Sequence, residues 1–339
     1  MPANLSPEYK EAEAAFRAAR DPKERLEHLR SMLRSIPKHK GTEHLQADLK
    51  TRIKELTEEL AGPKKGGARG GPALVVRSEG AAQVALLGPP NVGKSSLHAR
   101  LTGSHATVGP YPYCTKFPQP GMLPFEDVQF QLVDLPPVCA DYIEPWMGNT
   151  LQVTDAAALV VDLGDPECIE HIAAIRSRLD AIRVSLLEPA DRVEGSENED
   201  DLLDAFRVYL PTLIVANKCD RLADPGGELD VLCELTGLCF PSVAVSATTG
   251  AGLDEIGPLL FEMLGIVRVY TKVPGKRPET ERPFTVRRND TVRDVARLVH
   301  RGMADKVRFA RLWGSGDFEG QQVSCDHPVA DGDVLELHQ

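Results

Sequence analysis

The stretch GPPNVGKSS, residues 88–96, decides the fold expected of this chain. It follows the short apolar run QVALLG (83–88) and leads into SSLHARLTG (95–103), which has the pattern of a helix start. A glycine-rich turn between a strand and a helix places backbone N–H groups around phosphate oxygens. Within it, Lys94 can reach the β- and γ-phosphates, and the Ser95 hydroxyl can bind Mg²⁺. The stretch therefore predicts a nucleoside-phosphate site on an α/β domain.

Further apolar runs predict the sheet on which this turn is built. They are short, nearly continuous and rich in β-branched residues, as is typical of strands buried on both faces of a parallel sheet. Helical stretches alternate with them, so we expect helices on both faces. The predicted strands are QVALLG (83–88), VQFQLVD (128–134), AALVVDL (157–163), TLIVANK (212–218) and SVAVSA (242–247).

The motif NKCD (217–220) ends one of these strands and indicates the base. Ligands of open α/β sheets bind at this carboxyl edge. Asp220 can accept from guanine N1–H and the exocyclic amine together, a pair of donors that adenine lacks. Asn217 can tie the base loop to the phosphate loop, the Lys218 stem can cover the purine face, and SAT (246–248) suits the guanine O6 edge. The predicted nucleotide-binding residues are Gly88, Pro89, Asn91, Val92, Gly93, Lys94, Ser95, Ser96, Asn217, Lys218, Asp220, Ser246 and Ala247.

Taken in order, GPPNVGKS, VDLPP, NKCD and VSATTG resemble the motifs of a translation-factor-class GTPase. More narrowly, nearly the whole chain resembles the Obg superfamily and its developmentally regulated GTP-binding (Drg) branch. LTGSHATVGPYPYCT (101–115) is similar to the first switch of that branch, in which the final threonine closes over Mg²⁺ and the γ-phosphate. The resemblance thus implies GTP or GDP and Mg²⁺ as ligands. It implies Lys94, Thr115 and Asp134 as catalytic residues, and Ser95, Thr115 and Asp134 as metal ligands.

The segment QLVDLPPV (131–138) departs from the pattern of these relatives. Asp134 can still reach Mg²⁺ through water. The glycine whose N–H faces the γ-phosphate is replaced by Pro137, which has no N–H to donate. Val138 stands where many GTPases carry a water-orienting glutamine. We therefore expect GTP to bind, with the difference between GTP and GDP sensed weakly or through Thr115.

Changes in composition divide the chain into four segments. They are 1–61, a helical hairpin with helices over 7–35 and 42–61; 62–72, a flexible linker; 73–266, a P-loop GTPase (G) domain; and 267–339, a β-grasp unit that resembles the TGS domain. About 50 residues separate Asp162 from NKCD. The extra small domain of eukaryotic Drg proteins does not fit there, so the resemblance implies a compact, bacterial-type member.

The net charge of −11 is unevenly distributed, because residues 1–72 and 267–339 are each net basic and the acidic excess lies between them. An acidic centre argues against that centre lying on a polyanion and leaves the flanks as candidates. The resemblance implies the ribosome or structured RNA as a partner, reached through the N-terminal hairpin and the TGS domain. A packing or dimerisation role for the hairpin stays open beside RNA contact. No DNA contact is expected.

Hydropathy and the arrangement of cysteines indicate the cellular compartment in which the protein is expected. No apolar run approaches the 18 residues of a membrane span, and the charged N-terminus has no apolar signal core. The seven cysteines are scattered without a CxxC pair, which suits reduced thiols better than disulfides or a zinc site. We expect a cytoplasmic protein.

The activity implied is GTP binding with slow Mg²⁺-dependent hydrolysis in a ribosomal or translation-related setting. Two alternatives stay open: a GTP-gated RNA- or ribosome-binding module with little hydrolysis, and a nucleotide-dependent scaffold whose hairpin dimerises the chain. Asn91 also has two interpretations. It matches the position at which potassium-stimulated members of the superfamily hold K⁺, and it suits a turn by itself. His98 and His105 are expected to be solvated.

Overall fold

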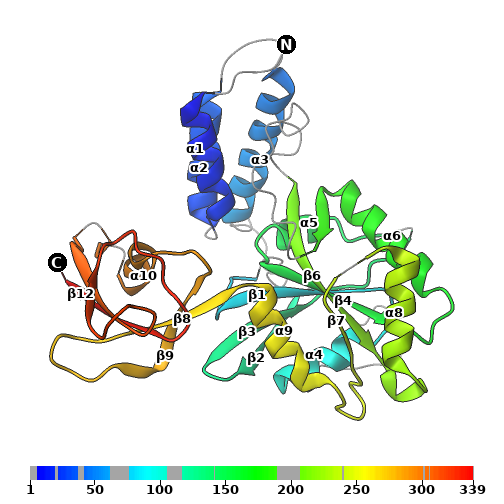
Figure 1. The fold of residues 1–339 in the computed structure, drawn as a ribbon. Helices are drawn as coiled ribbons and strands as arrows, with labels where there is room; N and C mark the ends of the chain where they lie inside the picture. The colour runs from blue at the N-terminus through cyan, green and yellow to red at the C-terminus, as the bar shows by residue number, and fades with distance from the viewer. Residues whose placement is uncertain are drawn as a thin grey trace, which may run out of the picture. The chain divides into compact units, whose positions relative to one another are not determined.

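In the computed structural model, the described residues are 6–19, 22–36, 42–61, 76–104, 117–140, 142–188, 207–238, 240–300, 302–304 and 306–338. The chain divides into two units, one formed by Met1–Ala73 and Arg192–Val208 and the other by Leu74–Asp191 and Tyr209–Gln339. Figure 1 shows the helices and strands of both units. The predicted linker over 62–72 lies outside the described residues.

The N-terminal unit contains three helices, α1 (Pro7–Ala18), α2 (Pro22–Ser35) and α3 (Glu43–Ala61). The prediction of one helix over 7–35 was therefore wrong. Pro22 is the first residue of α2, and proline disfavours the helical conformation in the residue before it; Ala19 is already extended, with φ −71° and ψ 130°. The three helices share one apolar core, formed by Tyr9, Phe16, Leu29, Met32, Ile36, Leu45 and Leu49.

The G domain is built on a mostly parallel sheet. Its strands are β1 (Ala82–Leu87), β2 (Gln119–Phe125), β3 (Val128–Asp134), β4 (Ala156–Asp162), β5 (Val184–Leu187), β6 (Val208–Asn217) and β7 (Ser242–Ala244). Within the described residues their order is β2-β3-β1-β4-β6-β5, with β7 also pairing with β6. β1 pairs in parallel with β3 and β4, and β6 with β4 and β7. All five predicted strands are present, and their carboxyl ends form one edge.

The edge strand β2 was not predicted from the sequence. It contains Pro120, Gly121 and Pro124, which weaken a strand pattern. An edge strand tolerates them because one side of its backbone needs no ladder partner. β2 pairs antiparallel with β3 from Gln119↔Asp134 to Phe125↔Val128, so its register is fixed along its whole length.

Helices cover both faces of this sheet. They are α4 (Lys94–Thr102), α5 (Met147–Leu151), α6 (Cys168–Ala181), α8 (Pro225–Thr236) and α9 (Ile256–Met263), with short 3₁₀ turns at η3 (Cys219–Arg221) and η4 (Leu253–Glu255). Leu97 of α4 and Leu260 of α9 share a core with alternate residues of β1, Val84 and Leu86. Successive strand residues point to opposite faces, and buried residues of α6 such as Ile175 are absent from that core. The predicted α/β architecture is confirmed.

The C-terminal module is a second, smaller sheet with one helix. It contains β8 (Ile266–Thr271), β9 (Glu279–Arg287), α10 (Val292–Val299), β10 (Phe309–Trp313), β11 (Gln321–Val323) and β12 (Asp333–His338), in the strand order β11-β10-β12-β8-β9. β8 and β12 are parallel, whereas β8 and β9 form an antiparallel hairpin. The helix follows Thr291, whose backbone N–H donates to Asp294 Oδ2 at 2.9 Å. Val292 and Val295 of the helix join the core of this sheet.

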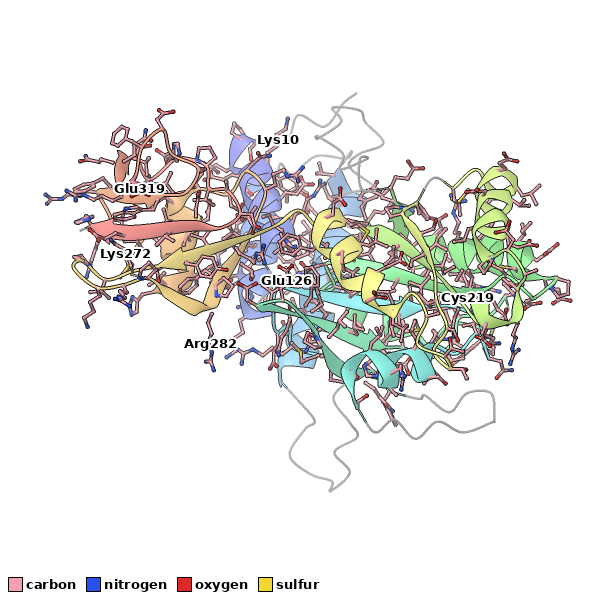
Figure 2. The ribbon with its side chains drawn as sticks, turned by 60° about the horizontal axis from the view of Figure 1, so that its bottom comes forward. Lys10, Glu126, Cys219, Lys272, Arg282 and Glu319 are labelled. Carbon is pink, nitrogen blue, oxygen red and sulfur yellow. The ribbon has the colours of Figure 1, made fainter. Side chains whose placement is uncertain are left out.

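A polar cluster, here called the hairpin seam, joins the C-terminal module to the G domain. It comprises Arg268 and Tyr270 of β8, Asp331 before β12, and Glu126 and Asp127 at the turn between β2 and β3, where Figure 2 labels Glu126. Arg268 donates to Asp127 at 3.0 Å and to Asp331 at 2.7 Å, and it also pairs with Glu126. Tyr270 Oη donates to Asp127, which raises the pKa of the tyrosine to about 12.

Among the residues that the structure describes, no helix combines the length and apolar character needed to cross a lipid bilayer.

Candidate functional site

The predicted phosphate loop lies between β1 and α4, and its two glycines are required by close approaches. Gly93 has φ 92°, and a Cβ there would lie 2.4 Å from Asn217 Nδ2. A Cβ on Gly88 would lie 2.4 Å from the Val160 carbonyl oxygen. Asn91 is also left-handed, with φ 63°, a conformation that asparagine adopts more readily than most residues. Side chains at these two positions would therefore collide with β4 and with Asn217, so the conformation of the loop requires glycine at both.

Lys94 is buried at the end of this loop, with only 7% of the residue exposed. Its ammonium donates to the carbonyl oxygens of Gly88 and Pro89, both at 2.9 Å. Burial lowers the pKa of Lys94 to about 8, and the nearby Asp134 carboxylate opposes that shift. The side chain thus remains mostly protonated at neutral pH and supplies positive charge beside the loop.

Ser95 and Asp134 bring two oxygen donors together next to Lys94. The Ser95 hydroxyl donates to Asp134 Oδ2 at 2.6 Å, although the two residues belong to different elements, α4 and β3. Mg²⁺ in nucleotide sites is held by one or two such oxygens together with phosphate oxygens and water, so this pair fits the ion. Thr115, the third predicted metal ligand, lies outside the described residues, and Ser96 is half-buried in the first turn of α4.

Asn217 connects three loops at the carboxyl edge of the sheet. Its side chain is almost completely buried, with 3% of the residue exposed. The Nδ2 group donates to the Val92 carbonyl of the phosphate loop at 2.8 Å, and Oδ1 accepts from the Ala247 N–H at 3.0 Å. The predicted tie between the base loop and the phosphate loop is therefore present, and the SAT segment is tied to it as well.

Two further residues of the NKCD motif, Lys218 and Asp220, form side-chain hydrogen bonds with residues outside the motif. Asp220 accepts from the Ser246 hydroxyl, and that hydroxyl oxygen in turn accepts from the Thr249 N–H at 3.1 Å. Ser246 is completely buried, whereas Asp220 is exposed to solvent. Lys218 has a left-handed backbone, φ 66°, and its ammonium donates to Asp162 Oδ2 at 2.7 Å. The exposed carboxylate of Asp220 is thus oriented by a hydrogen bond from a buried side chain.

The segment after β3 is closed against the phosphate loop. Pro136, Pro137 and Val138 are all buried. The Val138 N–H donates to the Gly88 carbonyl oxygen at 3.1 Å. Two of these three residues have no N–H, and the third N–H is already engaged. In this conformation, residues 136–138 therefore present no free backbone donor to a phosphate.

Two side chains that the fold places in this region were not predicted from the sequence. His98 was expected to be solvated, but it is 1% exposed, and its ring contacts the Leu132 carbonyl oxygen and the Ser104 hydroxyl, each at 3.3 Å. Burial lowers its pKa below the ordinary value, against the effect of Asp134. The position of His98 one helical turn after Lys94 was the sequence signal that could have indicated its burial. Asp162 was used only to count the residues before NKCD, although it ends a buried strand at the binding edge. His105 lies outside the described residues.

Two family models match the chain. Residues 83–218 match a family described as 50S ribosome-binding GTPase, and residues 267–339 match the TGS domain. The first match runs from β1 through the asparagine and lysine of NKCD, and the second covers the C-terminal module.

Relatives extend the similarity to most of the chain. An uncharacterized GTP-binding protein of Methanocaldococcus jannaschii is 29% identical over 93% of this chain and 92% of its own length. That alignment spans 363 residues, more than the 339 of this chain, so the relative contains residues that this chain lacks. Developmentally-regulated G-protein 2 of Arabidopsis thaliana is 26% identical over 93% of this chain and 90% of its own. The Schizosaccharomyces pombe YchF GTPase shares the fold, with a TM-score of 0.53 and 13% identity over 77% of this chain and 99% of its own.

Proposed function

Because this chain belongs to the Obg-type 50S ribosome-binding GTPases and carries a TGS domain, we propose that it binds GTP and GDP at the carboxyl edge of its G-domain sheet and hydrolyses GTP slowly with Mg²⁺. The observation that carries the proposal is the pair of bonds made by Asn217. This residue joins the phosphate loop through Val92 and the SAT segment through Ala247. One nucleotide can then be held by its phosphates and by its base at fixed separation.

Guanine is the base that this edge suits. The Asp220 carboxylate is exposed and oriented by Ser246, so it can accept from two neighbouring donors of one base edge. Guanine offers N1–H beside its amine, and adenine does not. Hydrogen bonds to charged groups contribute about 1.5–3 kcal/mol each, so this carboxylate favours guanine by roughly 3 kcal/mol or more.

This chain would contribute to hydrolysis by positioning the phosphates and Mg²⁺ and by placing positive charge beside them. Lys94 supplies charge at the phosphate loop, and Ser95 with Asp134 would hold Mg²⁺. Bound Mg²⁺ supplies further positive charge to phosphate oxygens. Val138 offers no side chain that could orient water, and we therefore propose a low intrinsic rate. Thr115 is proposed as an additional metal and γ-phosphate contact. K⁺ held by Asn91 stays a proposal beside its role in the left-handed turn.

A GTP-gated binding module with little hydrolysis is the second candidate. The specific observation in its favour is the buried segment of Pro136 and Pro137, together with the bond from Val138 to the Gly88 carbonyl. In both candidates the proposed partner is the ribosome or structured RNA, contacted through the basic flanks, in the cytoplasm. Support for that partner comes from the family description and from the charge distribution.

Two measurements test these proposals. Calorimetry with GDP and ADP should show binding of GDP only, and Asp220→Asn should weaken GDP at least about 100-fold while strengthening xanthosine diphosphate. Equal binding of ADP and GDP by the unmodified protein would refute the guanine site. Phosphate release over many turnovers then separates the two candidates, since a gated module releases almost none without its partner. Co-sedimentation with ribosomes at rising salt tests the partner, because contacts with phosphates weaken as salt increases.

A further inference from the structure

Asp162 lies at the binding edge but belongs to none of the nucleotide-binding motifs. It is the last residue of β4, and its register partner across the parallel pair is Asn217, the last residue of β6. Two strands that end side by side bring the Asp162 side chain next to the NKCD loop, 56 residues later in the chain. Figure 2 marks this edge through Cys219, which follows Lys218.

The Asp162 carboxylate is held on one oxygen and contacts the motif with the other. Oδ1 accepts from the backbone N–H of Gly164 at 3.1 Å, a bond within its own loop. Oδ2 accepts from the Lys218 ammonium at 2.7 Å. Only 15% of the Asp162 side chain and 23% of the Lys218 side chain are exposed. The lysine is thus tethered by a carboxylate that is itself oriented by the fold.

The tether decides where the Lys218 side chain lies. Lys218 directly follows β6, and its backbone is left-handed, with φ 66°. A lysine stem carries several rotatable bonds and loses rotamer entropy when it is fixed. The apolar stem of a lysine packs along flat apolar surfaces while its ammonium seeks a polar partner. In this chain the partner is Asp162, and the stem runs between that carboxylate and the base loop.

We propose that Asp162 is a positioning residue for the guanine base: it holds Lys218 so that the lysine stem covers one face of the purine. This inference rests on the proposed guanine site. Asp220 distinguishes bases by their hydrogen-bonding edge, whereas the Asp162–Lys218 pair contributes to any purine, because a ring face has no donors or acceptors to match. The two carboxylates therefore act on the same base in separable ways.

Calorimetry with guanosine and inosine diphosphates tests the assignment. Inosine lacks the exocyclic amine but keeps the purine face. Asp162→Asn should weaken both nucleotides by the same factor, about tenfold, which corresponds to the loss of a single charged contact of modest strength. The matched control is Asp165→Asn in the same loop, whose carboxylate accepts from the Glu167 N–H and lies near His171. The control should leave both affinities unchanged.

A double-mutant cycle separates positioning from a structural effect. Lys218→Met keeps an apolar stem and removes the ammonium, so it should weaken guanosine diphosphate by a factor similar to that of Asp162→Asn. In the Lys218→Met background, Asp162→Asn should have no further effect, because its contact is already absent. A full tenfold loss that persists in that background would overturn the assignment, as would equal losses from Asp162→Asn and Asp165→Asn.

Asp220→Asn distinguishes the failure of this inference from that of the proposed function. If Asp220→Asn shifts preference to xanthosine diphosphate and Asp162→Asn changes nothing, the guanine site stands and the role of Asp162 is refuted. If Asp220→Asn leaves guanosine diphosphate binding unchanged, the guanine site itself is refuted, and the Asp162 assignment with it.

Discussion

The loops that face the base and the segment that follows β3 are built in opposite ways. In the loops that face the base, side-chain hydrogen bonds connect neighbouring loops. Asn217 bonds to Val92 and Ala247, and Ser246 bonds to Asp220. In the segment after β3, Pro136 and Pro137 are buried, and neither has a backbone donor. From this difference we propose that the base-binding loops are preorganised for a nucleotide, whereas the segment after β3 discriminates only weakly between GTP and GDP. Mutations on the two sides should therefore change different quantities.

Asn217→Ala should have the largest effect. It leaves the Val92 carbonyl and the Ala247 N–H without their partner in a buried region, and an unsatisfied buried group costs about 1–3 kcal/mol. Because two groups lose their partner, we expect GDP and a non-hydrolysable GTP analogue both to bind at least about 30-fold more weakly, with the ratio of their affinities unchanged. Calorimetry with both nucleotides measures this, and Asn149→Ala on the exposed side of α5 is the control. A change in the ratio would show that the base side also senses the γ-phosphate.

Arg268→Ala at the hairpin seam should mainly change stability. The Arg268 side chain is 19% exposed and pairs with three carboxylates, of which Glu126 is 56% exposed. Breaking a buried pair costs about 3–5 kcal/mol, and solvent screening reduces this to about 1–3 kcal/mol. We expect the melting temperature to fall by roughly 2–10 °C.

The control for Arg268→Ala is Arg282→Ala. Arg282 lies on β9, is exposed to solvent and is labelled in Figure 2. The seam lies at the turn of the β2–β3 hairpin, and Asp134 lies at the other end of the same hairpin. If residues 136–138 are as stiff as their two prolines suggest, Arg268→Ala should leave the GDP-to-GTP affinity ratio unchanged. A shifted ratio would connect the C-terminal module to this segment.

Pro137→Gly should change the ratio of the affinities for GDP and the GTP analogue and have little other effect. It restores an N–H where relatives have a γ-phosphate donor, which is worth about 1.5–3 kcal/mol, but it adds freedom to the unliganded segment. The gain in preference for the GTP analogue should be at most about tenfold. Pro136→Gly is the matched control, because it adds similar freedom but places the N–H one residue earlier. Equal changes from both variants would assign the effect to flexibility alone.

His98 should give the smallest effect, visible only in the pH dependence of stability. Its pKa is lowered in the folded protein, mainly by burial. The unfolded chain therefore takes up a proton near pH 6.5, before the folded protein does, so the stabilisation from a neutral His98 is present above that pH and declines as pH falls below it. His98→Gln should flatten the curve of stability against pH by up to about 1.4 kcal/mol per pH unit. Parallel curves for both proteins would show that the pKa of His98 is the same in the folded and the unfolded chain.

Elements with a strong local signal could be predicted from the sequence. The five buried strands follow from continuous β-branched runs, and the phosphate loop from glycine, lysine and serine within one turn. The strand β2 could not be predicted, since its prolines oppose a strand and only the pairing with β3 holds it in place. The break between α1 and α2 was overlooked although Pro22 was a visible signal.

By itself, the sequence determined the loop between β1 and α4, the residues proposed to recognise the base and the missing backbone donor at Pro137. These depend on side chains and backbone groups within a few residues of one another, so local spacing is sufficient. Only the tertiary structure decided that Asp162 holds Lys218, that Val138 binds the Gly88 carbonyl, and that Arg268 reaches the turn at Glu126 and Asp127. These partners are brought together by strand order and register, because a chain of alternating strands and helices places distant residues at one sheet edge.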